Sequence, residues 1–299
     1  MFSIATLWIP FTVTAALGQV ARNAMQRQLT GPLGTWGATN IRFLFGFPFS
    51  IVFLAVVLAV SGDHWPVPTA SFWPWLLLGA LTQITGTGMM LLAMNERSFV
   101  VTTAYLKTEA IQTAIFGFVF LGDHLTLMKV IAILIATIGV VIAALRPGAE
   151  KGFADLKPTL LGLGAAASFA LSAVGFRGAV IAVSGVSFVT AASFTLVLGL
   201  FVQTLVLSIY LMVRAPDVLR KILGLWKPSM LAGFMGAFAS QFWFLAFALT
   251  AAANVRTLAL VEVLFAQAVA YYSFKQPVSA RELFGIVLIV IGVALLVTA

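Results

Sequence analysis

The chain consists of long apolar runs separated by short polar or turn-forming segments. The runs are continuous rather than alternating, which is typical of membrane-spanning helices and argues against the strands of a transmembrane barrel. Turn sequences such as Thr30-Gly31-Pro32 and Ser61-Gly62-Asp63 separate neighbouring runs. The pattern predicts ten spanning helices, at residues 3–24, 35–60, 71–94, 99–121, 126–145, 158–182, 186–213, 228–250, 254–274 and 279–298.

Composition gives the same class of protein. Of the 299 residues, 62% are hydrophobic and 9% are charged, whereas a soluble domain carries about 25% charged residues. A water-soluble fold cannot bury so much apolar surface, and a disordered chain is poor in apolar residues. The first run lacks the basic start and the cleavage site of a signal peptide, so we expect it to be the first span. The sequence therefore predicts an all-α integral membrane protein.

The charged residues outside the runs are mostly basic and give the chain a net charge of +8. Basic residues scattered over short loops are the ordinary topology signal of a membrane protein, so we do not expect nucleic acid as a partner. Most of the 17 Lys and Arg residues belong to the odd-numbered connections or the adjoining helix ends: Arg22, Arg27, Arg97, Arg146, Lys151, Lys157, Arg214, Arg220, Lys221, Lys227, Lys275 and Arg281. This bias predicts that these connections are cytoplasmic and that both termini are non-cytoplasmic, in a multi-pass protein of the inner (plasma) membrane.

The chain also shows signs of an internal repeat. A polar segment at 148–157 divides it into a first half, 1–147, and a second half, 158–299, each with five predicted helices. An offset of 153 residues superposes Glu109 on Glu262, and Thr126 on Ser279. Chance similarity between apolar helices is the alternative, but a shared intramembrane Glu is rare. Because five is an odd number, the second half would enter from the opposite side, which gives an inverted repeat.

Two segments close the predicted halves with related motifs: FLGDHLTLMKVIAILIATIGVVIAAL (120–145) and KQPVSARELFGIVLIVIGVALL (275–296). The first has an acid, Asp123, followed by a Leu-Thr pair and a late Gly139 in the helix; the second keeps Ser279 and the glycines but lacks the acid. These motifs resemble the EamA type of the drug/metabolite transporter superfamily. The resemblance implies a ten-helix transporter without identifying a substrate.

This chain departs from that family in one respect. Members usually carry a proline in the middle of the fourth and ninth helices, whereas the segments around Glu109 and Glu262 contain none. A substrate known from other members therefore does not transfer to this sequence.

Charges inside the predicted spans are the main functional candidates. An ionised residue at the centre of a span costs about 2.5–3.5 kcal/mol on insertion scales, so it tends to face a cavity or a partner. Arg22 and Arg42 lie near helix ends and could instead extend to the membrane surface. The candidates are Arg22, Arg42, Lys107, Glu109, Arg177 and Glu262, with Arg256 at a helix start.

Glu109 and Glu262 lie near the middle of their helices, and the repeat makes them equivalent. We expect them on opposite walls of one central cavity, with Tyr105 and Gln112 on the same helix face as Glu109. They would bind a substrate or a proton; the alternative is a structural ion pair, or a protonated carboxyl bonded to a neighbouring backbone. Lys107 stands about 200° round the helix from Glu109, so it would pair with another helix or add positive charge at the cavity edge.

Further polar and small residues have a functional and a structural interpretation. Gln83, Gln241 and Trp243 would either orient a ligand or bond neighbouring helices together. Two pairs of small residues seven apart, Ala132/Gly139 and Gly285/Gly292, are expected to allow close helix packing. Asp123 is expected to cap the following helix rather than to relay protons.

The sequence lacks the motifs of several other function classes. It contains no P-loop and no H-E-x-x-H, and its two histidines lie in loops, so neither ATP hydrolysis, a metal site nor an intramembrane enzyme is expected. No cofactor is expected, although the two Glu residues would permit proton coupling.

We therefore expect a secondary transporter that exports an amino acid or another carboxylate-bearing metabolite by alternating access. The excess of positive charge among the intramembrane candidates suits an anionic group on the solute, and a Glu suits an ammonium. The alternatives are an exporter of apolar drugs or cationic compounds, and a membrane scaffold that transports nothing. Expected partners are a small solute and the lipid bilayer, with the protein a monomer or a homodimer.

Overall fold

The structure, a computed structural model, describes residues 4–96, 105–144, 156–265 and 279–299. Among these residues, six helices are long and apolar enough to cross a membrane: Gln28–Ser61, Phe72–Ala93, Thr159–Ile181, Phe188–Arg214, Trp226–Leu249 and Ala280–Thr298. Glu109–Leu121 and Leu127–Ala143 are shorter apolar helices. Parts of the fourth and ninth predicted spans, and most of the predicted loop 148–157, lie outside the described residues. The count of ten spans and the division into two halves therefore stay predictions.

The chain forms two compact units, Met1–Ile84 with Gly175–Thr250, and Thr85–Val174 with Ala251–Ala299. We call them the first and second units. Each unit contains segments from both predicted halves of the sequence. Two helices, α3 (Phe72–Glu96) and α7 (Leu156–Ile181), contribute to both units.

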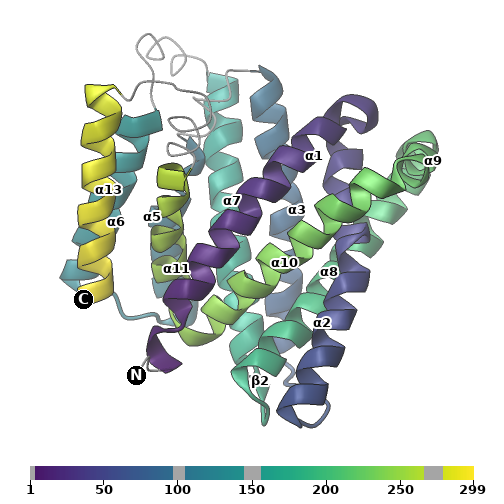
Figure 1. Ribbon diagram of the computed structural model, residues 1–299, viewed down its shortest axis with the longest axis horizontal. Coiled ribbons are helices and arrows are strands. Elements are labelled where there is room, and N and C mark those ends of the chain that lie inside the picture. Colours follow the sequence, from purple (N-terminus) through teal and green to yellow (C-terminus); the bar gives the residue numbers. More distant parts are fainter. Residues whose placement is uncertain (1–3, 97–104, 145–155, 266–278) are drawn as a thin grey trace. The chain divides into compact units, whose positions relative to one another are not determined.

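The first unit is built of helices and one short strand pair (Figure 1). Beside parts of α3 and α7 it contains η1 (Ile4–Thr6), α1 (Trp8–Leu44), α2 (Gly46–Ser61), β1 (Val67–Pro68), β2 (Val183–Ser184), α8 (Phe188–Arg214), α9 (Pro216–Gly224) and α10 (Trp226–Leu249). The two-residue strands were not expected from the apolar pattern.

The expected connection between the first two spans is wrong in detail. Residues 25–33 are helical, so the turn sequence Thr30-Gly31-Pro32 lies inside α1. The helix is interrupted instead at Gly34, whose φ of +67° is a conformation that other residues rarely adopt. Pro32 lacks an N–H and weakens the helix locally, but the change of direction falls two residues later, where glycine permits it.

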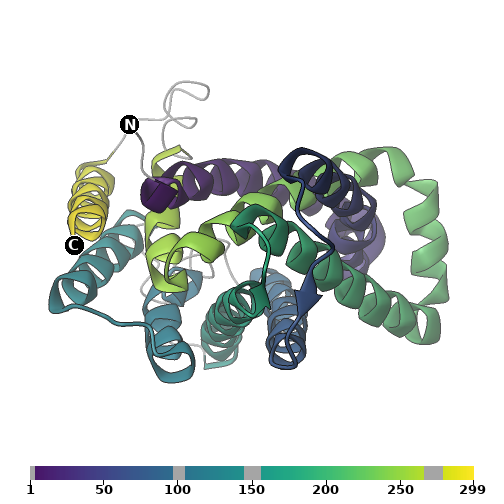
Figure 2. The ribbon, with the colours of Figure 1, turned by 90° about the horizontal axis from the view of Figure 1, so that it is seen from below.

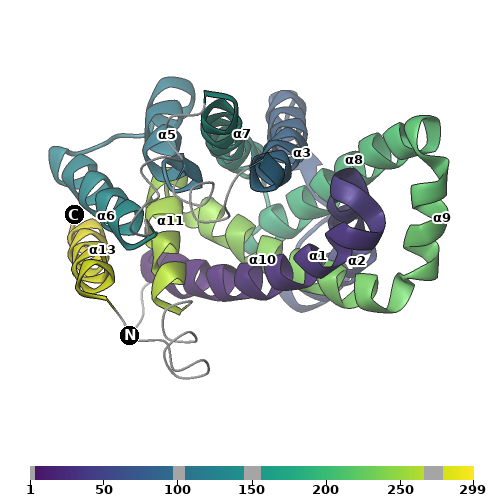
Figure 3. The same cartoon turned by 90° about the horizontal axis from the view of Figure 1, so that it is seen from above.

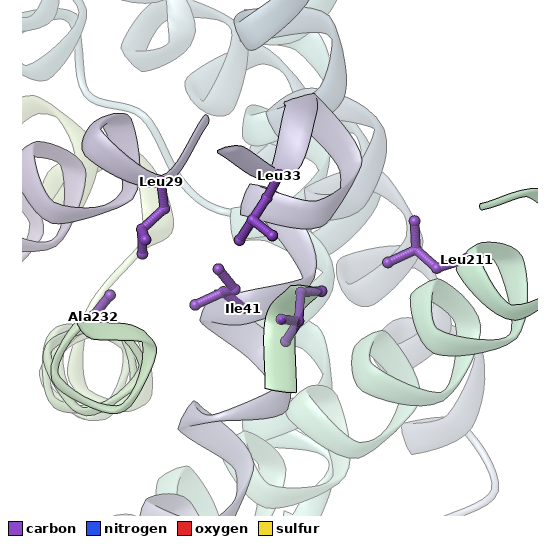
Figure 4. Close-up of a cluster of buried hydrophobic side chains, with 6 residues drawn as sticks. Leu29, Leu33, Ile41, Leu211 and Ala232 are labelled. Atoms are coloured by element: carbon purple, nitrogen blue, oxygen red, sulfur yellow. The ribbon is translucent and has the colours of Figure 1, made fainter. Parts of the chain in front are cut away.

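A cluster of apolar side chains explains why α1 stays helical up to this kink. Leu29 and Leu33 before Gly34, and Ile41 after it, pack with Leu211 of α8, Ile222 of α9 and Ala232 of α10 (Figure 4). The kink thus lets both arms of α1 bury apolar side chains in one cluster. Helix α9 was not expected, because its segment is too short and too polar to be a span, although Val218, Leu219 and Ile222 have helical spacing.

Two loops of the first unit are joined by hydrogen bonds and by the strand pair. Val67 of β1 pairs with Ser184 of β2 in an antiparallel ladder. Nearby, one carboxylate oxygen of Asp63 accepts the Ser187 N–H (3.1 Å), the Ser187 hydroxyl (2.5 Å) and the Thr190 hydroxyl (2.5 Å). The hydrogen bonds from Ser187 and Thr190 lower the pKa of Asp63 from its ordinary value of 3.8 to about 2.

The second unit contains the remaining parts of α3 and α7, the segments that follow α3 in the first predicted half, and the segments that follow α10 in the second. These are α5 (Glu109–Phe116), the π-helical turn η2 (Gly117–Leu121), α6 (Leu127–Ala144), α11 (Ala252–Leu258), the 3₁₀ turn η4 (Ala259–Val261) and α13 (Ala280–Thr298). Figure 2 shows α6 and α13 side by side.

Small residues bring α6 and α13 into close contact, as the sequence predicted. A Cβ atom on Gly139 would lie 2.7 Å from the carbonyl oxygen of Gly285, and one on Gly292 would lie 2.8 Å from the carbonyl oxygen of Ala132. Contacts that advance along α6 go backward along α13, so the two helices are antiparallel. Backbone approach this close is possible only where side chains are absent or minimal.

Equivalent residues begin these two helices. The Ser279 hydroxyl accepts the Glu282 N–H (3.2 Å) in a full capping box at the start of α13. The Thr126 hydroxyl accepts the Lys129 N–H (3.2 Å) at the start of α6. The prediction that Asp123 caps this helix is therefore wrong, because α6 begins at Leu127 and Thr126 is the residue directly before it.

The α6–α13 contact predicts that substitution of two glycines by alanine has very different effects on stability. We expect Gly139→Ala to lower the melting temperature of the purified protein, since the added methyl group would force the helices apart at about 1–3 kcal/mol. Gly31→Ala is the matched control, because a Cβ there meets no atom within 4 Å. It should leave the melting temperature unchanged or raise it. Equal effects of the two substitutions would contradict the proposed packing.

The hydrogen bonds of Asp63 predict a dependence of stability on acid pH. Because the pKa of the folded state is lowered, the stabilisation is fully present above about pH 4 and is lost as the pH falls from 3.8 toward 2. Asp63→Asn should reduce stability at neutral pH and flatten the unfolding profile over this acid range. Thermal unfolding in detergent at stepped pH measures both effects, with the exposed Asp217→Asn as the control. An unchanged acid profile in the Asp63 variant would refute the prediction.

Candidate functional site

The fourth predicted span is interrupted directly before Glu109. Tyr105 and Leu106 are helical, Lys107 and Thr108 form a turn, and α5 begins at Glu109. The Thr108 N–H donates to the carbonyl oxygen of Tyr105 (3.1 Å), a tight three-residue spacing. The helix is thus broken here even though the segment contains no proline.

The ninth predicted span is interrupted at the equivalent place. The α-helix α11 ends at Leu258, the 3₁₀ turn η4 covers Ala259–Val261, and helix resumes at Glu262. With the offset of 153 residues, Lys107 and Thr108 correspond to the last two residues of η4. Each Glu therefore stands immediately after a tight turn. Such interruptions often mark functional positions in helices.

Two ion pairs connect these interrupted segments. Glu109 Oε1 lies 2.9 Å from Arg256 Nε, and Lys107 Nζ bonds Glu262 Oε1. The pairs are crossed, because each Glu is paired with a basic residue of the other segment. The four side chains are between 11% and 18% exposed, and Lys107 and Glu262 also interact electrostatically with Glu109. We call Lys107, Glu109, Arg256 and Glu262 the charge quartet.

The quartet is electrically balanced, with two carboxylates and two cations. Transfer of a single charge into an apolar interior is expensive, and a partner with good geometry offsets that cost. Lys107 pairs with another helix, which was one of the two roles expected from its position. Arg256 was expected at a helix start and was not grouped with the two Glu residues, but it lies in the last turn of α11. An Arg within an otherwise apolar run was the sequence signal for its place in the quartet.

The other second-unit candidates make neighbouring contacts. The Tyr105 hydroxyl hydrogen-bonds the Thr159 hydroxyl of α7 (2.7 Å), and a Cβ on Gly162 of α7 would lie 2.7 Å from the Tyr105 ring. The Gln112 amide donates to the Thr108 hydroxyl (3.0 Å), at the turn before Glu109. Tyr105 therefore ties the interrupted segment to α7, and Gln112 bonds the turn itself.

The first unit holds the remaining arginine candidates. Arg177 donates to the carbonyl oxygens of Phe247 (2.8 Å) and Thr250, so it satisfies backbone groups at the end of α10. Arg22 donates to the Asn23 side chain (2.7 Å). Arg22 and Arg42 are each 6% exposed, and a Cβ on Gly236 would meet both side chains. They are buried among helices of the first unit.

The amide and indole candidates of the first unit connect helices. Gln83 accepts from the Gln203 amide (2.8 Å), and Gln241 donates to the Ser193 hydroxyl (2.8 Å). Trp243 is 4% exposed and stacks on Phe247 with ring centroids 6.4 Å apart. These contacts correspond to the structural interpretation of the three residues; a role in ligand binding stays a prediction.

In the described part of the chain, no three His, Asp or Glu side chains come together as metal ligands would. The charge quartet is the feature with the most chemical capacity. It brings two carboxylates and two cations together beside two helix interruptions.

The largely buried pairing predicts strong coupling between Glu109 and Arg256. Glu109→Gln and Arg256→Gln should each lower stability by up to about 3–5 kcal/mol, because each removes the ion-pair partner of a largely buried charge. The double variant should recover most of the loss. Thermal unfolding of the four proteins gives the coupling free energy.

The exposed pair Asp217–Arg220 (3.3 Å) serves as the control cycle. Its coupling should be between about 0 and 1 kcal/mol. Additive effects of the Glu109 and Arg256 substitutions would show that the pair is not formed in the protein.

Comparison with known proteins supplies the family. A model of the EamA-like transporter family matches residues 6–145 and again residues 156–298. A solved structure named only "Crystal structure of protein" is 14% identical, with a TM-score of 0.71 and 97% of each chain covered; at this identity the likeness concerns the fold. A comparison with curated proteins gives no match.

The two family matches cover nearly the whole chain, one in each predicted half. The apolar helices agree with this assignment, since the described residues alone contain six helices able to cross a membrane. Proteins of this family are transporters rather than enzymes. The chain belongs to the EamA-like transporter family and is a multi-pass membrane transporter of the drug/metabolite transporter kind.

Proposed function

We propose that the protein is a secondary transporter that exports a small zwitterionic metabolite, such as a neutral amino acid, by alternating access. The charge quartet is its solute site. The observation that carries this proposal is the crossed pairing of Glu109 with Arg256 and of Lys107 with Glu262.

The quartet suits a zwitterion because the solute can insert between the two partners of one pair. The ammonium of an amino acid would bind a Glu, and its carboxylate would bind the cation that this Glu releases. The positive and negative charges in the site then balance both before and after the solute binds. An anion or a cation would add one uncompensated charge in a region of low dielectric constant, where such a charge is costly.

The location of the charged candidates narrows the solute class expected from the sequence. The excess of positive charge among the intramembrane candidates came from Arg22, Arg42 and Arg177, which belong to the first unit. The second-unit quartet is neutral by itself. It therefore supports a zwitterion in preference to the wider class of carboxylate-bearing solutes.

The helix interruptions add polar groups for recognition. Discontinuous helices in secondary transporters place backbone N–H and C=O groups beside the solute at the membrane midplane. The turn at Lys107–Thr108 and the turn η4 stand directly before Glu109 and Glu262. This position supports a site in which side-chain charges and backbone dipoles act together.

Three features support the inverted repeat that alternating access requires. The interruptions correspond under the offset of 153 residues, as do the helix caps Thr126 and Ser279. The contact of Gly139 with Gly285 corresponds to that of Gly292 with Ala132, with the two helices exchanged. An exchange of this kind between antiparallel helices is the signature of a two-fold axis perpendicular to them.

For orientation, we propose the arrangement that the loop charges favour. The odd-numbered connections are cytoplasmic, and both termini are on the other side of an inner (plasma) membrane. Export then moves the solute from the side that carries most of the basic loops.

The test is transport by purified protein in liposomes, with labelled neutral amino acids, a monocarboxylate and a quaternary ammonium cation. We expect uptake of the amino acid alone. The variant Glu109→Gln/Arg256→Gln removes a whole pair and should fold, yet it should transport at least about tenfold more slowly, since it loses charge-assisted bonds to the solute. Measurements with and without a pH gradient determine whether a proton moves with the solute.

Asp217→Gln/Arg220→Gln is the matched control, since it removes an exposed ion pair and should transport normally. Retained transport in Glu109→Gln/Glu262→Gln would refute the assigned site. Uptake of the cation that is lost in the same variant would favour an exporter of cationic compounds. Absence of transport and of stabilisation by any solute would favour a membrane scaffold.

A further inference from the structure

The short helix α9 lies across the ends of two spanning helices of the first unit. It follows α8 after Ala215 and leads into α10 through Leu225. Figure 1 shows α9 nearly end-on, while α10 runs across the view. Figure 3 shows α9 along the edge of the unit, between α8 and α10. A helix that crosses the ends of spanning helices has the placement of a helix at the membrane surface.

One face of α9 fixes it to the unit. Ile222 is fully buried, and Val218, Leu219 and Leu225 pack against the same apolar cluster as Leu29 and Leu33 of α1. A Cβ on Gly37 of α1 would lie 2.6 Å from the Val218 side chain. The helix is therefore held by packing, and its other face has a fixed position.

That other face is basic and exposed. Arg220 and Lys221 lie on α9, Arg214 ends α8, and Lys227 lies in the first turn of α10; all four are exposed. We call these four residues the basic rim. The acid on α9, Asp217, lies 3.3 Å from Arg220. Both partners of this pair are about 80% exposed, so water screens their attraction and Arg220 keeps most of its capacity for another anion.

Large apolar side chains stand beside the basic rim. Val213 is 74% exposed, Leu223 67% and Trp226 51%. Lys227 Nζ lies 5.7 Å from the centre of the Trp226 ring. Trp is enriched at the boundary between lipid chains and headgroups, where its ring contacts both. The surface thus combines cations for a phosphate with apolar groups for the chains attached to it.

We propose that α9 and the basic rim form a binding site for anionic phospholipids of the surrounding bilayer. The lipid phosphate contacts the cations of the rim, and the acyl chains lie along the exposed apolar side chains. Charge complementarity selects this occupant, because a zwitterionic lipid brings a cation that the rim repels. The site is independent of the solute site in the second unit.

The test measures binding of fluorescent phosphatidylglycerol to the full chain in detergent micelles, with phosphatidylcholine of the same acyl chains as the comparison. Phosphatidylglycerol should bind the wild type more tightly. Each basic residue is worth about fivefold in affinity for an anionic lipid surface, so Arg220→Gln/Lys221→Gln should weaken binding roughly 25-fold. Asp217→Asn should strengthen it, because it removes the one carboxylate on α9.

Lys129→Gln, a basic-residue change in the second unit, is the matched control and should leave binding unchanged. Melting temperatures of all variants show whether each is folded. Equal affinity for the two lipids, or no effect of the rim substitutions in folded protein, would overturn the proposal. Displacement of the lipid by inorganic phosphate at matching concentration would also overturn it, since it would make the ligand a free anion.

Discussion

A charged side chain among apolar helices requires a counter-charge, because neither lipid nor packed side chains replace the water that it loses. In the second unit two crossed ion pairs meet this requirement. Glu109 holds Arg256, and Lys107 holds Glu262. Each pair joins the segment around α5 to the segment around η4, so the charges connect two helices that are themselves interrupted. The geometry of these segments depends on this pairing.

The interruption of the helix before Glu109 allows the two ion pairs to form between the same two segments. A regular helix would place Lys107 and Glu109 about 200° apart, so that they would face different neighbours. The turn at Lys107–Thr108 breaks the regular spacing, and both side chains reach the same opposing segment. Elsewhere in the unit, Gly139, Gly285 and Gly292 let the backbones of α6 and α13 meet. Within the second unit, ion pairs thus join the segments around α5 and η4, and small-residue packing joins α6 and α13.

Much of the fold is predictable because it follows from local chemistry. Long apolar runs became helices, and Ser61-Gly62-Asp63 ended α2 at Ser61, with Gly62 in the left-handed conformation. The sequence-based predictions of helix bounds were wrong where tertiary packing overrides the local conformational preference of the residues. The Thr30-Gly31-Pro32 turn stayed helical because Leu29 and Leu33 are buried, and α9 formed because Ile222 fits the same cluster. The residue that caps a helix is the one directly before its first helical residue. Because α6 begins at Leu127, its cap is Thr126 and not Asp123.

By itself, the sequence determined the class of protein, the positions of most helices and the few charges within them. These properties follow from hydropathy and turn chemistry, which act over neighbouring residues. Only the tertiary structure decided which charges are partners, since Glu109 and Arg256 are far apart in the chain. It also decided that Arg177 satisfies the end of α10 and that Tyr105 bonds Thr159. Pairing depends on which helices become neighbours, and hydropathy, which is nearly the same for all of them, carries no information about that choice.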